Sequence, residues 1–142
     1  MTVFLLSTVY CLLSTSSHDL WRFLPVGYLF TVALETPVLV LLLSRRHTLK
    51  RRLLAGLWLT ACTYPVVVLV LPTLFAGSSR ALYLAVAETF APAAECALFY
   101  LAFGAVDARS TWRDFAAIVA ANLLSFLAGE VLSVYGWLGL FL

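Results

Sequence analysis

Four long apolar stretches fill most of this chain of 142 residues, and they cover residues 23–44, 53–75, 81–105 and 115–138. A helix needs about 20 consecutive apolar residues to cross the hydrocarbon core of a bilayer. Charged residues make up only 11% of the sequence, whereas soluble domains contain about 25%. The sequence therefore predicts an all-α integral membrane bundle of four transmembrane helices in one domain, surrounded by lipid. The composition excludes a nucleic-acid-binding module and a secreted disulfide scaffold.

The first 22 residues differ from the four spans. Residues 3–13 are apolar but too short to cross a bilayer, and they lack the basic start and small residues of a secretory signal. We expect residues 1–22 to form a short interfacial or re-entrant helix. Trp21 is expected at the membrane surface, where aromatic side chains are enriched.

Basic residues are concentrated in two predicted loops. Residues 45–52 carry five of the nine Lys and Arg side chains, and Arg109 and Arg113 precede the fourth span. Because cytoplasmic loops are rich in Lys and Arg, the 45–52 loop is predicted to be cytoplasmic, with both termini outside. Binding of anionic lipid headgroups is an alternative role for this loop. Eight Arg against one Lys favour a GC-rich bacterial source, and hence a bacterial inner membrane.

All four Glu residues lie inside predicted spans, whereas the three Asp residues lie in predicted loops. Glu35 is in the first span, Glu88 and Glu95 are in the third, and Glu130 is in the fourth. An acidic side chain at a span centre costs about 2.5–3.5 kcal/mol on an insertion scale, and no span contains Lys, Arg or His. Each Glu must therefore be protonated, bound to a cation, hydrogen-bonded within the bundle or paired with a partner chain.

Spacing indicates how these side chains come together. Glu88 and Glu95 are seven residues apart, so they lie on nearly the same face of a helix, as a proton or cation relay requires. Gly27, Thr31 and Glu35 form a stripe with four-residue spacing that is expected to face the bundle. The sequence predicts a proton- or cation-binding site formed by Glu35, Glu88, Glu95, Glu130, Asn122 and Thr63.

Proline residues occur at similar depths in the first three spans. Each of them removes a backbone donor and frees the carbonyl group four residues earlier, and irregular backbone in a membrane is tolerated where it lines a cavity. We expect helix breaks at Pro37, Pro65 and Pro92, which would free the carbonyls of Ala33, Ala61 and Glu88. A kink that only shapes helix packing is the alternative at each position.

Small residues recur every four positions in the fourth span, at Ser125, Gly129 and Ser133. This pattern is typical of a helix-packing seam, because small side chains let two helix backbones approach closely.

Oxygen ligands dominate the predicted site, and they suit protons and hard cations. The identity of any metal stays open. Cys62 and Cys96 also allow a mixed thiolate site, although isolated cysteines in spans usually act as small packing residues. His18 and His47 lie in predicted loops and are expected to be solvated.

The motifs HExxH and GxxxxGK are absent, so the sequence disfavours an enzyme, and no cofactor is expected.

Local sequence strings occur in each span: ETP, TYP, ETFAPAAE and NLLSFLAG. Together they resemble a group of small uncharacterised bacterial four-span integral membrane proteins, which implies a four-helix bundle but no activity. A Glu in the first of four short spans is also similar in layout to the small multidrug resistance exporters, which work as dimers with a membrane-embedded Glu coupled to protons. Those exporters lack the Glu88 and Glu95 pair, so their substrate is not carried over.

Two functions follow as expectations. The first is proton- or cation-coupled transport or ion handling by a homo-oligomer. The second is an accessory or assembly subunit of a larger membrane complex, whose Glu residues pair with partner helices. A purely structural role for buried, protonated Glu residues is the third alternative.

Overall fold

The computed structural model describes residues 17–104 and 108–134, which are mostly helical and contain no strand. The elements are α2 (Ser17–Leu42), α3 (Leu49–Pro65), the π-helical turn η1 (Val66–Val70), α4 (Leu71–Leu74), α5 (Arg80–Phe103) and α6 (Ala108–Val134). Four segments are long and apolar enough to cross a membrane: Leu24–Leu42, Leu49–Leu74, Ala81–Phe103 and Ala108–Leu132. The predicted all-α integral membrane bundle of four spanning helices is therefore confirmed.

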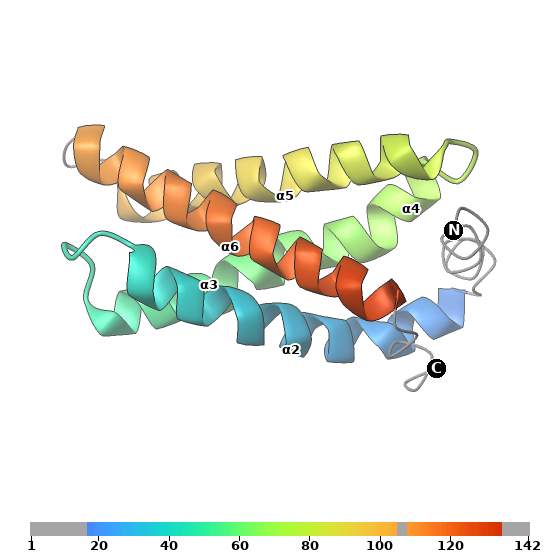
Figure 1. The fold of residues 1–142 in the computed structure, drawn as a ribbon, viewed down its shortest axis with the longest axis horizontal. Helices are drawn as coiled ribbons and strands as arrows, with labels where there is room; N and C mark the ends of the chain where they lie inside the picture. The colour runs from blue at the N-terminus through green and yellow to red at the C-terminus, as the bar shows by residue number, and fades with distance from the viewer. Residues whose placement is uncertain (1–16, 105–107, 135–142) are drawn as a thin grey trace.

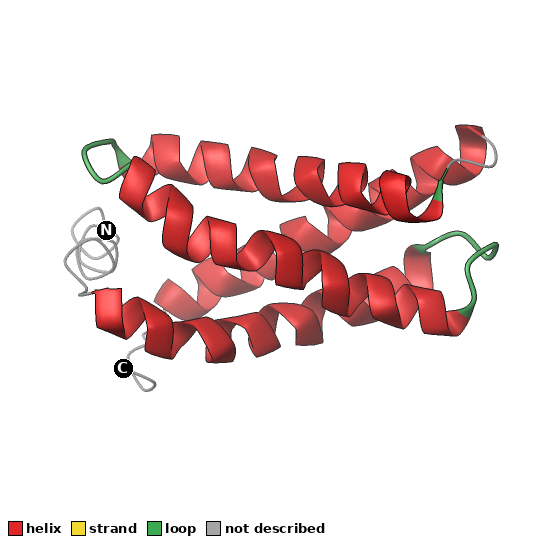
Figure 2. Ribbon diagram, turned by 180° about the vertical axis from the view of Figure 1, so that it is seen from behind, coloured by secondary structure: helices red, strands yellow, loops and turns green. Residues whose placement is uncertain are grey.

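The four spanning helices run lengthwise and alternate in direction (Figure 1). Both α2 and α5 pack against α3 and α6, and the same arrangement is seen from behind (Figure 2). The basic end of the bundle holds residues 43–48 and the starts of α3 and α6. The opposite end, called the far end below, holds residues 75–79 and the start of α2.

Exposed tryptophans mark both ends of the bundle. Trp21 is 64% exposed near the far end, and Trp112 is 73% exposed near the basic end. Tryptophan is enriched at both membrane interfaces because its ring is amphipathic. Between these two levels, many large apolar side chains are exposed on the helices, as expected for surfaces that face lipid.

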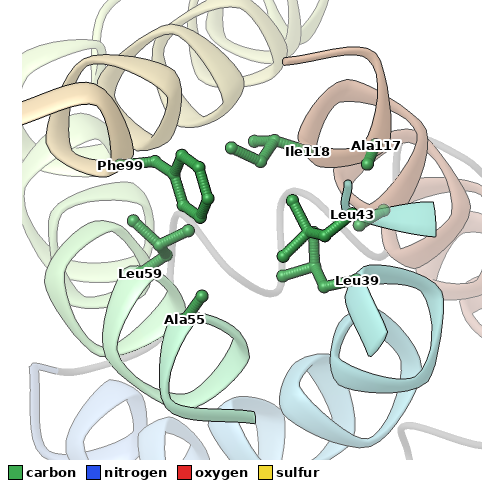
Figure 3. Close-up of a cluster of buried hydrophobic side chains, with 8 residues drawn as sticks. Leu39, Leu43, Ala55, Leu59, Phe99, Ala117 and Ile118 are labelled. Carbon is green, nitrogen blue, oxygen red and sulfur yellow. The ribbon is translucent and has the colours of Figure 1, made fainter. Parts of the chain in front are cut away.

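An apolar core fills the half of the bundle nearer the basic end. All four spanning segments contribute to it, and their side chains point into a common interior (Figure 3). The apolar core consists of Leu39, Leu43, Ala55, Leu59, Phe99, Ala117, Ile118 and Ala121. It closes the interior between the basic end and the middle of the membrane.

The backbones of α2 and α3 approach closely at Thr36 and Gly56. A Cβ atom placed on Gly56 would lie 2.9 Å from Thr36 Cβ and 3.0 Å from Thr36 Cα. Both distances are too short for ordinary van der Waals contact, so only glycine fits. This contact fixes α2 against α3 directly beside Glu35.

Helix ends differ from the sequence-based expectation in two places. Helix α2 begins at Ser17, so residues 17–22 continue into the first spanning helix and do not form a separate interfacial helix. The rest of the expected interfacial segment lies outside the described residues.

Helix α6 begins at Ala108, so residues 108–114 are helical and not a loop. Basic side chains in a first helical turn can reach the membrane surface while the helix continues, which explains the earlier start.

The proline positions are also more regular than expected. Helix α2 continues through Pro37 and α5 continues through Pro92, so the breaks expected there are absent. Losing one backbone donor does not interrupt an otherwise complete spanning helix. Only Pro65 is followed by a change of helix type, because η1 begins at the next residue.

The π-helical turn leaves one carbonyl group for another helix. The Leu71 amide donates to Val66 O, and the next residue, Pro72, has no amide hydrogen to give to Val67 O. The Tyr83 hydroxyl of α5 donates to Val67 O at 3.2 Å instead. The irregular backbone of η1 is thus tied to α5.

Candidate functional site

A cavity of about 150 Å³, lined by both polar and apolar side chains, lies between the apolar core and the far end. Since a water molecule occupies about 30 Å³ in the liquid, the cavity has room for several waters. Residues from α2, α3, η1, α5 and α6 line it. Its polar lining consists of Thr31, Glu35, Thr60, Thr63, Tyr64, Glu88, Glu95, Asn122 and Ser125.

Glu35 lies on α2 and is almost completely buried, with 3% of its surface exposed. Thr60 Oγ1 of α3 lies 2.7 Å from Glu35 Oε2. Ser125 Oγ of α6 lies 2.7 Å from Glu35 Oε1. Each carboxyl oxygen therefore has a hydroxyl partner from a different helix.

Glu95 lies on α5 and is 2% exposed. Thr63 Oγ1 lies 2.7 Å from Glu95 Oε1, and Asn122 Nδ2 donates to Glu95 Oε2 at 2.7 Å. The amide group of Asn122 also donates to Ile118 O at 3.1 Å. This second bond fixes which amide atom faces Glu95, because a carbonyl oxygen cannot donate.

Every hydroxyl in this network also contacts a backbone carbonyl. Thr60 Oγ1 lies 2.8 Å from Gly56 O, and Thr63 Oγ1 lies 3.1 Å from Leu59 O. Ser125 Oγ lies 2.9 Å from Asn122 O. A hydroxyl has one hydrogen to donate, so each of these groups can donate either to the carboxyl group or to the carbonyl.

This choice of partner allows two protonation states. When a Glu is ionised, the hydroxyl donates to the carboxylate. When the Glu is protonated, the carboxyl group donates to the hydroxyl oxygen, and the hydroxyl hydrogen turns to the carbonyl. Gain or loss of a proton thus needs only rotation of hydroxyl hydrogens, and no buried polar group loses its partner.

The other two predicted Glu residues lie nearer the far end. Glu88 is half-buried on α5 and lines the same cavity as Glu95, as the seven-residue spacing predicted. Glu95 lies near enough to Glu35, and Glu88 near enough to Glu35 and Glu130, for ionised carboxylates at these positions to repel one another. Three of the four predicted carboxyl groups, Glu35, Glu88 and Glu95, line the cavity, and Glu130 does not line it.

Among the described residues, no Lys, Arg or His lines the cavity. Within the same part of the chain, no group of three or more His, Cys, Asp or Glu side chains is arranged to hold a metal ion. Cys62 is exposed on the outside of the bundle, and Cys96 is partly buried with its sulfur 4.0 Å from Phe115 O. Neither cysteine lines the cavity.

The residues of the predicted packing seam on α6 do not share one environment. Ser125 bonds to Glu35 and belongs to the cavity. A Cβ atom on Gly129 would meet nothing within 4 Å among the described residues, so the bundle leaves room beside it. Helix packing at Gly129 and Ser133 stays a prediction.

A second buried cluster lies at the basic end, centred on Asp114 of α6, which has no exposed side-chain surface. Asp114 Oδ1 accepts from the Ser44 amide at 2.7 Å. Asp114 Oδ2 lies 3.1 Å from Ser44 Oγ, 2.8 Å from Arg46 Nη2 and 3.1 Å from His47 Nε2. The cluster joins the α2–α3 connection to the start of α6.

Arginines in the same region satisfy the carbonyl groups at the end of α2. Arg52 donates to Val40 O at 2.8 Å and to Ser44 O at 3.2 Å. Arg113 donates to Leu42 O at 3.0 Å. The carbonyls of Val40 and Leu42 lack partners within the helix, so these arginines stabilise the end of α2.

Asp114 and His47 lie in surroundings that differ from the sequence-based expectation. Asp114 was expected in a loop and His47 was expected to be solvated, yet both are buried, and His47 is only 4% exposed. Burial is possible because the two side chains contact one another and Arg46. One signal was present in the sequence: Arg46, His47 and Asp114 all adjoin predicted spans at the same end.

Comparison with known proteins finds no matching family model, no similar curated protein and no similar solved structure.

Proposed function

We propose that this protein conducts or couples protons across a bacterial inner membrane, with Glu35 and Glu95 as the central proton-binding groups. The observation that carries the proposal is the set of hydroxyl groups around the two carboxyl groups. Thr60, Thr63 and Ser125 each have both a carboxyl and a carbonyl partner within hydrogen-bonding distance. In such a network each carboxyl group keeps its hydrogen bond to a hydroxyl whether the Glu residue is protonated or ionised.

A proton fits this site better than a metal cation does. All four carboxyl oxygens of Glu35 and Glu95 already face a hydrogen donor at 2.7 Å. A metal ion would have to displace these donors, and Asn122 would then present an NH₂ group to it. Proton exchange requires no such displacement.

The positions of the carboxyl groups favour a route that opens toward the far end. Glu88 lines the cavity on the far-end side of Glu95, and Glu130, near the end of α6, lies farther in the same direction outside the cavity lining. The apolar core closes the other direction. The cavity therefore serves the far side of the membrane in this conformation.

Orientation follows from the charges at the basic end. The residues Arg45, Arg46, Lys50, Arg51, Arg52, Arg109 and Arg113 all lie at or near this end. By the positive-inside rule the basic end faces the cytoplasm, which puts both termini outside. The cavity then faces the outside.

An accessory subunit of a larger membrane complex is the second candidate. The open space beside Gly129 favours it, because small residues on an accessible helix face let a partner helix approach. The same face would also serve a homo-oligomer. Glu35 and Glu95 do not require a partner chain, since their hydrogen bonds are made within the bundle.

The test is proton flux into liposomes that contain the purified protein and an internal pH-sensitive dye, driven by a potassium diffusion potential. Glu95→Gln keeps the shape of the side chain but cannot exchange a proton, so we expect flux to fall by about a hundredfold. Cys62→Ser, on the exposed surface, is the matched control and should keep its flux.

Undiminished flux in Glu95→Gln would remove Glu95 from the route. Flux that depends on sodium in the buffer would favour a metal cation as the transported ion. A wild-type protein without flux that co-purifies with a stoichiometric foreign chain would favour the accessory subunit.

A further inference from the structure

His47 is a buried histidine on the opposite side of the apolar core from Glu95. Its side chain is 4% exposed, and its Nδ1 atom is buried without a hydrogen-bond partner. A buried ring nitrogen without a partner is costly.

The other ring nitrogen, Nε2, faces both a donor and an acceptor. Arg46 Nε lies 2.9 Å from His47 Nε2 and can donate to it. Asp114 Oδ2 lies 3.1 Å from the same atom. An ionised carboxylate oxygen accepts hydrogen bonds and cannot donate one. One nitrogen cannot satisfy both neighbours at once, because it either carries a hydrogen or does not.

These two neighbours suit the two protonation states of the ring. In the neutral ring with its hydrogen on Nδ1, the Nε2 lone pair accepts from Arg46. A proton that arrives at Nε2 uses this lone pair, and the resulting imidazolium donates from Nε2 to Asp114. Loss of the proton reverses the change. Nε2 therefore has a suitable partner in either state, whereas Nδ1 carries its hydrogen without an acceptor in both.

The position of the ring connects it to the cavity. His47 packs edge-to-face on Phe99, with ring centroids 5.2 Å apart, and on Phe103, at 5.7 Å. Phe99 belongs to the apolar core and follows Glu95 by four residues on α5, so the two lie on one face about 6 Å apart along the helix axis. One aromatic layer thus separates His47 from the nearest carboxyl group of the cavity.

The charged groups that face His47 come from three elements. Asp114 faces it from α6 and Arg46 from the α2–α3 connection, and Arg52 of α3 donates to its carbonyl oxygen at 3.1 Å. From α5 the ring meets Phe99 and Phe103. Asp114 is the one anion in this set, and it is placed to receive the hydrogen of the charged ring.

We propose that His47, held by Asp114 and Arg46, is the proton-exchange site on the cytoplasmic side of the apolar core, and that Phe99 separates it from Glu95. The inference rests on the proposed function, because it extends the same proton route beyond the cavity. It assigns His47 as the proton-binding group, and Asp114 and Arg46 as the residues that position it.

The first test reads His47 directly and does not depend on flux. The chain has two histidines, so His18→Gln leaves His47 as the sole source of imidazole signals in ¹⁵N-histidine-labelled protein in nanodiscs. We expect its ring nitrogens to change from the neutral to the imidazolium pattern as pH falls within the range in which the bundle stays folded. Ring-nitrogen signals that stay fixed over that range would overturn the inference and leave a structural contact.

The second test measures flux in the liposome assay. His47→Gln should lower flux by about a hundredfold, as expected for loss of a proton-transfer group, and His18→Gln should keep wild-type flux. Undiminished flux in His47→Gln would overturn the inference while the proposed function stands. Absence of flux in the wild type would overturn the proposed function, and the imidazole spectrum separates the two failures.

Discussion

The hydroxyl group of Thr63 lies 2.7 Å from one carboxyl oxygen of Glu95, and the same hydroxyl lies 3.1 Å from the carbonyl of Leu59. It therefore links the side chain of α5 to the backbone of α3 in either protonation state of Glu95. Asn122 has no such freedom, because its NH₂ group only donates. The exchangeable proton of Glu95 is consequently expected on Oε1, the oxygen that faces Thr63.

Thr63→Val should lower proton flux by about tenfold or more, because the proton on Glu95 loses the group that accepts it. The substitution should also lower the free energy of unfolding by about 1–3 kcal/mol, the cost of a buried polar group without its partner. Thr89→Val is the matched control. Thr89 is exposed on the same helix as Glu95, and its hydroxyl donates to Ala85 O at 2.7 Å. Equal flux in the two variants would exclude Thr63 from the route.

Infrared difference spectra recorded between high and low pH should show carbonyl-stretch bands of protonated carboxyl groups that are removed by Glu35→Gln and by Glu95→Gln. The two residues contact different donors, since Glu35 meets two hydroxyls and Glu95 meets one hydroxyl and one amide. Their bands are therefore expected at different frequencies. Spectra that contain neither band would show that the buried pair does not exchange protons.

Gly56→Ala should destabilise the protein by about 1–3 kcal/mol, because the added methyl group overlaps Thr36 on the neighbouring helix. Gly129→Ala is its control, since a Cβ atom there meets nothing within 4 Å in the described part of the chain. Alanine in a helix interior is favoured over glycine by about 1 kcal/mol, so this variant should be as stable as the wild type or more so. Thermal unfolding in detergent measures both. A fall in native mass on Gly129→Ala would instead place another chain at that face.

Asp114→Asn should lower the free energy of unfolding by about 3–5 kcal/mol, the usual cost of removing one partner from a buried ion pair. The loss arises because Arg46 and His47 keep their places at the basic end while the carboxylate that joins them is gone. Arg109→Gln removes a charge from an exposed side chain at the same end and should change stability little. If both substitutions cost the same, the cluster does not join α6 to the α2–α3 connection.

The spans and most of the central site could be predicted from the sequence because both depend on local rules. Apolar stretches of sufficient length identify the helices, and the seven-residue spacing of Glu88 and Glu95 places both on the cavity. The roles of Thr60 and Ser125 as partners of Glu35 could not be predicted. Hydroxyl residues in spans commonly bond to their own helix backbone, and only the packing of α3 and α6 against α2 brings these two to the carboxyl group.

The buried cluster around Asp114 at the basic end could not be predicted from the sequence, for a different reason. Charged residues next to a span are usually solvated at the membrane surface, and nothing in the local sequence distinguishes Asp114 from the other Asp residues. Its burial depends on Ser44, Arg46 and His47, which are about 70 residues earlier in the chain. Such a long-range contact depends on how α6 packs against α2 and α3, which the local sequence does not show.

The π-helical turn after Pro65 also determines which side of the span faces the interior after the turn, in α4. In a regular α-helix, the eight residues from Thr63 to Leu71 rotate by about 800°, which would leave Leu71 about 80° away from the direction of Thr63. The wider turn at Val66–Val70 rotates less per residue, and Leu71 is buried on the interior, as Thr63 is. The chain thus holds one residue more than a straight helix would use here. Deleting a single valine from this turn would restore a regular α-helix, in which seven residues rotate by about 700° and leave Leu71 within about 20° of the direction of Thr63. The extra residue therefore changes the backbone hydrogen bonds of the turn, including the carbonyl of Val67 that Tyr83 contacts, more than the direction that α4 faces.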